Sequence, residues 1–293
     1  MTTTEHAIDP SSIVVAADGS DDADRAIDWA AAQAFLERRP LVVLTAVGIA
    51  GVPAVTWAGM GAAYAYQPDD LLTHGRAIAD AGRDRAEHLH PGLAVTTAVQ
   101  VGDPRQVLVD LSRQVHLVVM GSRGRGLFRS KVLGSVSASV SRDAACPVVV
   151  CRPGTEDRAA GAGAGILVGA DGTPESLPVL EHAFRLASLR DLPLTVMHCV
   201  WEQPGPTEEH RLLLAESIAG IRSAYPEVAV ELRLASGLAE EALAADSARW
   251  DAVVVGRHPV DTLLRLVTGA VATTVVERAR TTVAVVPQAD PPC

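Results

Sequence analysis

The sequence predicts an α/β protein built from two tandem, doubly wound, five-stranded parallel-sheet domains. Three observations lead to this prediction. The chain contains a long internal repeat, and each copy alternates apolar strand-like runs with segments of helical period. Its 293 residues, 48% of them hydrophobic and 20% charged, exceed what one modest core needs. Strands that are apolar on both faces are typical of a parallel sheet covered by helices on both sides.

The repeat extends without a gap over 35 residues. Residues 13–47 match residues 166–200 at 12 positions, all at a constant offset of 153. The pair Asp18-Gly19 returns as Asp171-Gly172. A repeat of this length predicts two homologous domains.

A second match supports the division into two domains. It pairs the stretch around Gly121 with that around Gly256, at an offset of 135. The period therefore predicts domains at residues 1–152 and 166–293. Residues 153–165 are rich in Gly, Ala and Pro, and we expect them to form the linker.

The elements of the first copy follow from their local patterns. Residues 13–17 form a short β-branched run, which predicts a buried strand. Ala23, Ala26, Ile27 and Ala30 then fall on one face of a helix. Further strands are expected at 41–46, 94–101, 117–120 and 148–151, and further helices at 71–89, 104–113 and 134–143.

The change of offset places 18 extra residues in the first copy, after Val47. The segment from Gly48 to Gln67 carries Trp57, Tyr64 and Tyr66 on an apolar background, and we expect a long loop between strand and helix. An apolar segment of this kind is a candidate surface for association, so a homodimer is one arrangement that the sequence leaves open. No motif marks a surface for a signalling partner.

Charge and composition exclude several classes of function. The formal net charge is −10, so no basic surface is expected to track a nucleic-acid backbone. The first 12 residues contain Glu5 and Asp9 and no apolar run, and no stretch of 18 apolar residues occurs, so a soluble, cytoplasmic protein without membrane contact is expected. The four cysteines form no CxxC pair and predict neither a disulfide nor a metal framework.

A glycine-rich loop follows the apolar strand at 117–120. Gly121 and Gly124 let the backbone approach a ligand closely, and Gly134-Ser135 opens the next helix, whose first N–H groups are unpaired. This arrangement predicts a phosphate-binding loop with a hydroxyl attached. The alternative is that the glycines only permit tight turns. The spacing fits neither GxGxxG nor the Walker loop.

The spacing Gly121-x2-Gly124-x9-Gly134-Ser135 resembles the ATP-binding signature of the universal stress protein family. The run from Gly121 to Val150 and the opening strand that ends in Asp18-Gly19-Ser20 resemble this family as well. The resemblance covers both halves of the chain. It implies two Rossmann-like domains of the adenine nucleotide alpha hydrolase type, and an ATP-binding regulator of a stress response.

The resemblance also implies roles for individual residues. Asp18 would lie at the adenine and ribose end of the pocket, with capping of the next helix as the alternative. Arg123 would be an outer phosphate contact, with a loop arginine that points to water as the alternative. The remaining positions would meet adenine through the Ala46 backbone, ribose at Met120 and Gly121, and phosphates at Gly124, Gly134, Ser135 and Val136.

The second copy departs from this pattern. Gly256 and Gly269 keep the spacing, but Pro259 replaces Gly124 and Ala270 replaces Ser135. Proline removes an N–H and fixes φ, and alanine removes a hydroxyl donor. We therefore expect the second domain to bind ATP weakly or not at all. His198 ends the second strand of this copy, where we expect a hydrogen-bonded structural residue.

The sequence favours binding over catalysis. No Asp or Glu lies between Gly121 and Ser135, and Lys131 is not at a Walker position, so at most a weak ATPase is expected. Mg²⁺ would be held by phosphate oxygens and water. A slow ATPase and a nucleotide-independent interaction protein are the two alternatives. The family resemblance further implies that the strands at 148–151 and 283–286 face each other.

Overall fold

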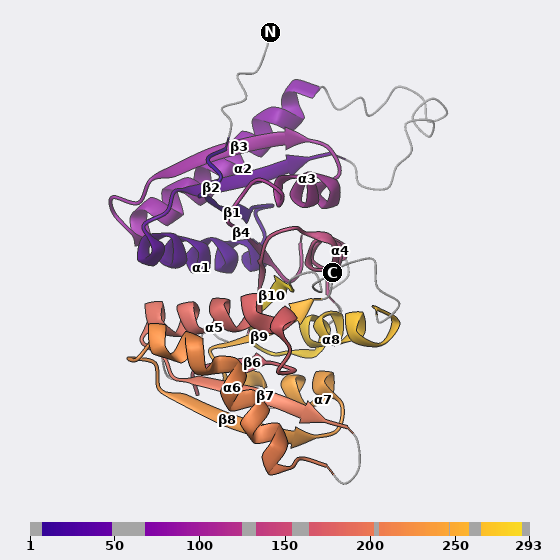
Figure 1. Ribbon diagram of the computed structural model, residues 1–293. Coiled ribbons are helices and arrows are strands. Elements are labelled where there is room, and N and C mark those ends of the chain that lie inside the picture. The colour runs from indigo at the N-terminus through magenta and orange to yellow at the C-terminus, as the bar shows by residue number, and fades with distance from the viewer. Residues whose placement is uncertain are drawn as a thin grey trace. The chain divides into compact units, whose positions relative to one another are not determined.

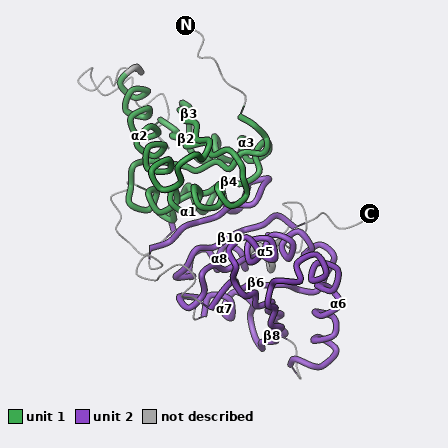
Figure 2. Tube along the Cα trace, turned by 90° about the vertical axis from the view of Figure 1, so that its left-hand side faces the viewer, with its two compact units in different colours: residues 1–130, 134–140 green, residues 131–133, 141–293 purple. Residues whose placement is uncertain are grey.

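A computed structural model describes residues 8–48, 68–124, 133–153, 164–201, 205–245, 247–257 and 265–288. Within these ranges, the side chains at 68–69 and 265–270 are not described. The chain forms two compact units (Figure 2). Residues 1–130 and 134–140 make the first unit, and residues 131–133 and 141–293 make the second.

The first unit is a parallel sheet in the strand order β3-β2-β1-β4 (Figure 1). Its helix α1 packs against α2. The strands are β1 (Ile13–Ala16), β2 (Leu41–Val47), β3 (Val95–Val101) and β4 (Leu117–Gly121), and the helices are α1 (Asp21–Glu37), α2 (Pro68–Leu89), α3 (Pro104–Leu111) and the start of α4 (Ser135–Asp143). Every strand and helix expected here from the sequence is present, with ends that differ by a few residues.

Local sequence explains where the helices of this unit begin and how closely they pack. Ser20 caps α1 by accepting a hydrogen bond from the Ala23 N–H at 3.2 Å, and Asp103 caps α3 with Pro104 directly after it. In α2, a Cβ at Gly82 would lie 2.9 Å from Cγ1 of Val43. The glycine therefore lets α2 approach the sheet more closely than a larger residue would allow.

The second unit repeats this architecture and adds one antiparallel strand. Its strand order is β5-β10-β9-β6-β7-β8, parallel from β10 to β8. The strands are β5 (Val148–Cys151), β6 (Ile166–Gly169), β7 (Leu194–Val200), β8 (Val230–Ser236), β9 (Ala252–Arg257) and β10 (Thr282–Pro287). The helices are α5 (Leu177–Arg190), α6 (Glu208–Ala224), α7 (Ala239–Ala244) and α8 (Arg265–Arg278), with short 3-10 turns η2 (Pro174–Ser176) and η3 (Ser247–Arg249).

The last strands of the two copies pair with each other. β5 runs antiparallel to β10, with Val149 opposite Ala284. The expected pairing of these strands is confirmed. It also explains why the compact units do not divide at the linker: β5 belongs to the first copy in sequence but packs with the second unit. The domain boundaries at 152 and 166 stay a prediction from the repeat, and residues 154–163 of the linker lie outside the described residues.

The predicted fold class is confirmed, because both units have a predominantly parallel sheet, and strands and helices alternate along the chain. The core consists mainly of aliphatic side chains from the central strands, several of them without any exposed surface. Most of the expected insertion, residues 49–67, lies outside the description. Among the helices that are described, none is both long enough and apolar enough to cross a membrane.

Candidate functional site

The candidate site lies where the strand order of the first unit reverses. β1 pairs with β2 on one side and with β4 on the other. The strand order therefore runs from β1 toward β2 and β3 in one direction and toward β4 in the other. Open parallel sheets bind ligands at the carboxyl ends of strands around such a point. Asp18 follows β1 and Gly121 ends β4. A Cβ at Gly124 would lie 2.5 Å from Oδ2 of Asp18, so the two predicted site residues face each other.

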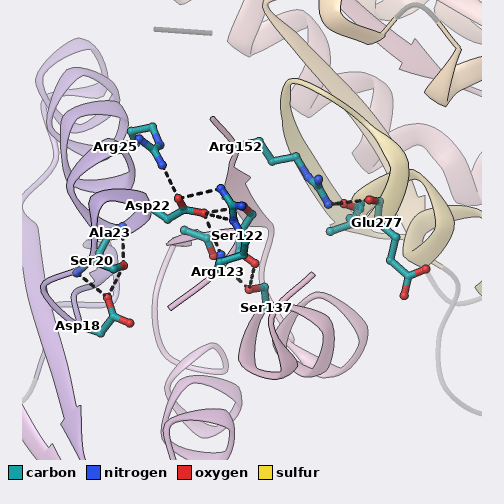
Figure 3. A network of polar contacts seen from close by, with 12 residues as sticks. Asp18, Ser20, Asp22, Ala23, Arg25, Ser122, Arg123, Ser137, Arg152 and Glu277 are labelled. Atoms are coloured by element: carbon teal, nitrogen blue, oxygen red, sulfur yellow. Dashed lines mark hydrogen bonds and ion pairs between the residues drawn. The ribbon is translucent and has the colours of Figure 1, made fainter. Parts of the chain in front are cut away.

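Asp18 shapes the turn that begins α1. Its Oδ1 accepts hydrogen bonds from the Ser20 N–H at 3.0 Å and from the Ser20 hydroxyl at 2.6 Å. Gly19, with φ of 75°, supplies the left-handed conformation between them. Ser20 caps the helix, and Asp18 orients the cap (Figure 3). The second carboxylate oxygen of Asp18 lies beside Gly124.

The glycines of the loop are positions of close backbone approach. A Cβ at Gly121 would lie 2.7 Å from the backbone carbonyl oxygen of Asp22, in the first turn of α1. The Gly134 N–H donates to the Ser122 carbonyl at 2.9 Å, and a Cβ on Gly134 would meet that same oxygen at 3.2 Å. The Ser137 hydroxyl lies 3.1 Å from the carbonyl oxygens of both Gly121 and Ser122. These contacts hold the two ends of the loop together.

Arg123 is bound to Asp22 rather than directed at water. The Asp22 Oδ2 accepts from the Arg123 backbone N–H at 3.1 Å and from its Nε at 3.2 Å, and from the Ser122 hydroxyl at 2.7 Å (Figure 3). Arg25 also forms an ion pair with Asp22. The role of Arg123 as a phosphate contact stays a prediction.

Sequence reasoning missed Asp22. The side chain is only 8% exposed. Burial by itself would raise the pKa of this carboxyl, but hydrogen bonds from Ser122, Arg123 and Arg25 outweigh burial and hold the pKa below its ordinary value. The sequence shows three acidic residues in the first turn of α1, at 21, 22 and 24. Only the packing of α1 on the loop shows that the middle one points inward.

The remaining predicted residues lie at the same end of the first unit. Met120 is buried in β4, and Ala46 is half-buried near the carboxyl end of β2, opposite Gln100 of β3. Ser135 is exposed as the first residue of α4, and Val136 is half-buried after it. Residues 125–132 of the loop lie outside the described part of the chain. The contact of each residue with a nucleotide stays a prediction.

The second unit keeps the aspartate turn. Oδ1 of Asp171 accepts from the Thr173 N–H at 2.9 Å and from its hydroxyl at 2.7 Å, and Gly172 has φ of 80°. The turn is followed by η2 instead of a regular helix, and Thr173 makes no side-chain cap. Pro259 lies outside the described residues, and Ala270 is described only as backbone in α8.

His198 and His210 lie beside the aspartate turn of the second unit. Nδ1 of His198 lies 3.0 Å from the Ala170 carbonyl, which confirms the expected structural hydrogen bond. Its ring stacks on His210 of α6, with ring centroids 5.7 Å apart. At Gly172, an added Cβ would meet Cδ2 of Leu213 at 2.7 Å. The start of α6 therefore packs closely against the loop after β6.

Cys199 is the counterpart of Ala46 at the repeat offset of 153. Burial, together with the nearby charge of Glu240, raises the pKa of its thiol to about 11. In the described part of the chain, Cys146, Cys151 and Cys199 form no disulfide. No group of three or more His, Cys, Asp or Glu residues suited to a metal ion occurs among the described residues.

Comparison with known proteins identifies the family. The sequence profile described as "Universal stress protein family" matches residues 11–152 and again residues 165–287. The chain belongs to the universal stress protein family. The two matches make it a tandem universal stress protein, and the resemblance inferred from the glycine loop is confirmed.

A relative supports this assignment, and solved structures resemble the chain. A universal stress protein of Mycolicibacterium smegmatis is 32% identical over 287 residues, which cover 94% of this chain and 96% of the relative. A universal stress protein from Archaeoglobus fulgidus has a TM-score of 0.73 at 18% identity, over 96% of this chain and 98% of that one. A smaller universal stress protein, solved in complex with cAMP, is 26% identical, with a TM-score of 0.36; the match covers 43% of this chain and 97% of that one.

Proposed function

We propose that this universal stress protein binds ATP in its first unit and acts as a nucleotide-dependent regulator of a stress response. The observation that carries the proposal is the close approach of Gly124 to Asp18. A Cβ at Gly124 would lie 2.5 Å from Oδ2 of Asp18. This approach brings the glycine loop after β4 to the carboxylate after β1, at the switch point of the sheet. In the proposed complex the Asp18 carboxylate binds the ribose, and the glycine backbone faces the phosphates.

The start of α4 supports the phosphate end of the proposed site. A helix N-terminus presents unpaired N–H groups and a partial positive charge, both of which favour anions. Ser135 is the first residue of α4 and is exposed, so its hydroxyl is accessible to a ligand. The bond from Gly134 to the Ser122 carbonyl sets the helix start against the strand end. In the proposed complex Gly124, Gly134, Ser135 and Val136 hold the phosphates.

The residues of this site favour retention of ATP over its hydrolysis. Hydrolysis needs a group that orients or deprotonates the attacking water. Within the described residues of the site, Asp18 bonds to Ser20, and Asp22 is buried and bonds to Ser122 and Arg123. Neither carboxylate is arranged as a general base. If Mg²⁺ accompanies ATP, phosphate oxygens and water would be its principal ligands.

Calorimetric titration of ATP into the full chain tests the proposal. The wild-type protein should bind ATP, and Ser135→Ala should weaken binding about tenfold, because it removes one hydroxyl donor to a charged phosphate. Ser223→Ala in α6 is a matched control, since this exposed serine donates its hydroxyl to the Ala219 carbonyl of its own helix. It should leave the affinity unchanged.

Two outcomes would contradict the proposal. If the wild-type chain binds no adenine nucleotide at millimolar concentration, the nucleotide-independent alternative holds. If ATP turns over at several per second in a phosphate-release assay, the protein is an enzyme.

A further inference from the structure

We propose that Asp22 is a positioning residue for the phosphate-binding loop, an inference that rests on the proposed ATP site. Asp22 belongs to α1, and the loop follows β4, 100 residues later in the chain. Its carboxylate connects these two segments directly. No part of the glycine signature includes it.

The contacts of Asp22 are concentrated on two consecutive loop residues. Ser122 donates its hydroxyl at 2.7 Å, and Arg123 donates its backbone N–H at 3.1 Å, Nε at 3.2 Å and Nη2 at 3.4 Å. Arg25, three residues later in α1, forms an ion pair with the Asp22 carboxylate. These bonds restrain the Arg123 backbone and the side chains of both Ser122 and Arg123.

Ser122 passes this restraint to the start of α4. Its carbonyl oxygen accepts from the Gly134 N–H at 2.9 Å. The same oxygen lies 3.1 Å from the Ser137 hydroxyl (Figure 3). Asp22 therefore holds Ser122 from one side while Gly134 and Ser137 hold it from the other. This continuous chain of bonds joins α1 to the helix end proposed to receive the phosphates.

Backbone packing reinforces the same contact. The space that a side chain at Gly121 would need is taken by the backbone and Cβ of Asp22, at 2.7 and 2.8 Å. The first turn of α1 and the end of β4 are thus in direct contact. The low exposure of Asp22 keeps water from competing for its bonds.

The corresponding positions of the second unit are arranged differently. Glu175, 153 residues after Asp22, lies in the 3-10 turn η2. Arg257, 135 residues after Ser122, donates from its guanidinium to the Ala144 carbonyl. The restraint by Asp22 thus accompanies the copy whose glycine loop is intact.

The test compares ATP with adenosine, which lacks the phosphates. Asp22→Asn should raise the ATP dissociation constant about tenfold and leave that of adenosine within about twofold, because only the phosphate contacts depend on loop position. Ser122→Ala, which removes a single donor to Asp22, should change the ATP affinity in the same direction and less. Thermal unfolding without ligand reports whether each variant is folded.

Asp21→Asn is the matched control, because Asp21 is an exposed acid in the same helical turn. It should change neither affinity. Unchanged or tighter ATP binding by Asp22→Asn, or an equal loss for ATP and adenosine, overturns the role of Asp22. If the wild-type chain binds no ATP, the proposed function itself fails, and the inference with it.

Discussion

Asp22 shows how much a single residue can depend on its surroundings. The sequence places it among acidic residues at a helix start. Such residues commonly face water and stabilise the helix by interacting with the partial positive charge of its N-terminus. In the folded chain it is buried, and its charge is balanced by Arg25 and Arg123. Its pKa lies below 3.8 because the hydrogen bonds it accepts outweigh the cost of burial.

This lowered pKa predicts how stability depends on pH. A carboxyl with a lower pKa in the folded state stabilises it above the unfolded value of 3.8, and this stabilisation is lost as the pH falls through the folded value. At pH 7 we expect Asp22→Asn to be less stable by about 2 kcal/mol, the scale of hydrogen bonds to a charged group. Urea unfolding at pH 7 and pH 3 measures this difference, which should narrow at pH 3. An equal difference at both values would show that the charge of Asp22 does not contribute.

Among the elements, the start of α1 differs most clearly from its counterpart in the second unit. Both copies begin with the same aspartate turn, with Gly19 and Gly172 at similar positive φ. In the first unit Ser20 caps a regular helix, whereas Thr173 is followed by the 3-10 turn η2. The serine therefore carries a capping bond that the threonine does not.

This difference predicts unequal effects of two matched substitutions. Ser20→Ala should destabilise the protein by about 1 kcal/mol, because the Ala23 N–H loses its partner. Thr173→Ala should cost less, because the Thr173 hydroxyl donates to Asp171, an exposed acid, and caps no helix. Denaturant midpoints of the two variants measure the contrast. A larger loss for Thr173→Ala would mean that the cap at Ser20 contributes little.

For the whole molecule, the repeat produces two similar folds that differ in the residues around the aspartate turn. Both units have the switch point and the aspartate turn. In the second unit, His210 stacks on His198 and Leu213 packs against Gly172, so helix α6 lies against the turn. The sequence adds Pro259 and Ala270 in the glycine loop of this copy. We expect both features to weaken nucleotide binding in the second unit.

We therefore expect one ATP per chain. Calorimetry should give a stoichiometry near one, and Gly124→Pro should abolish binding, because proline removes an N–H beside Asp18 and fills the space there. ATP at a hundred times its dissociation constant should stabilise the wild-type chain by about 2.7 kcal/mol and leave Gly124→Pro unaffected. A stoichiometry near two would show that the second unit accepts ATP despite its substitutions.

The sequence alone determined the fold class, the repeat and the glycine positions of the candidate site. These features are local or periodic: buried strands are apolar runs, helices have a 3.6-residue period, and close backbone approach requires glycine. The tertiary structure decided that Asp22 points inward while Asp21 faces water, and that Arg123 pairs with Asp22. Both depend on contacts between residues about 100 positions apart, which no local pattern in the chain encodes.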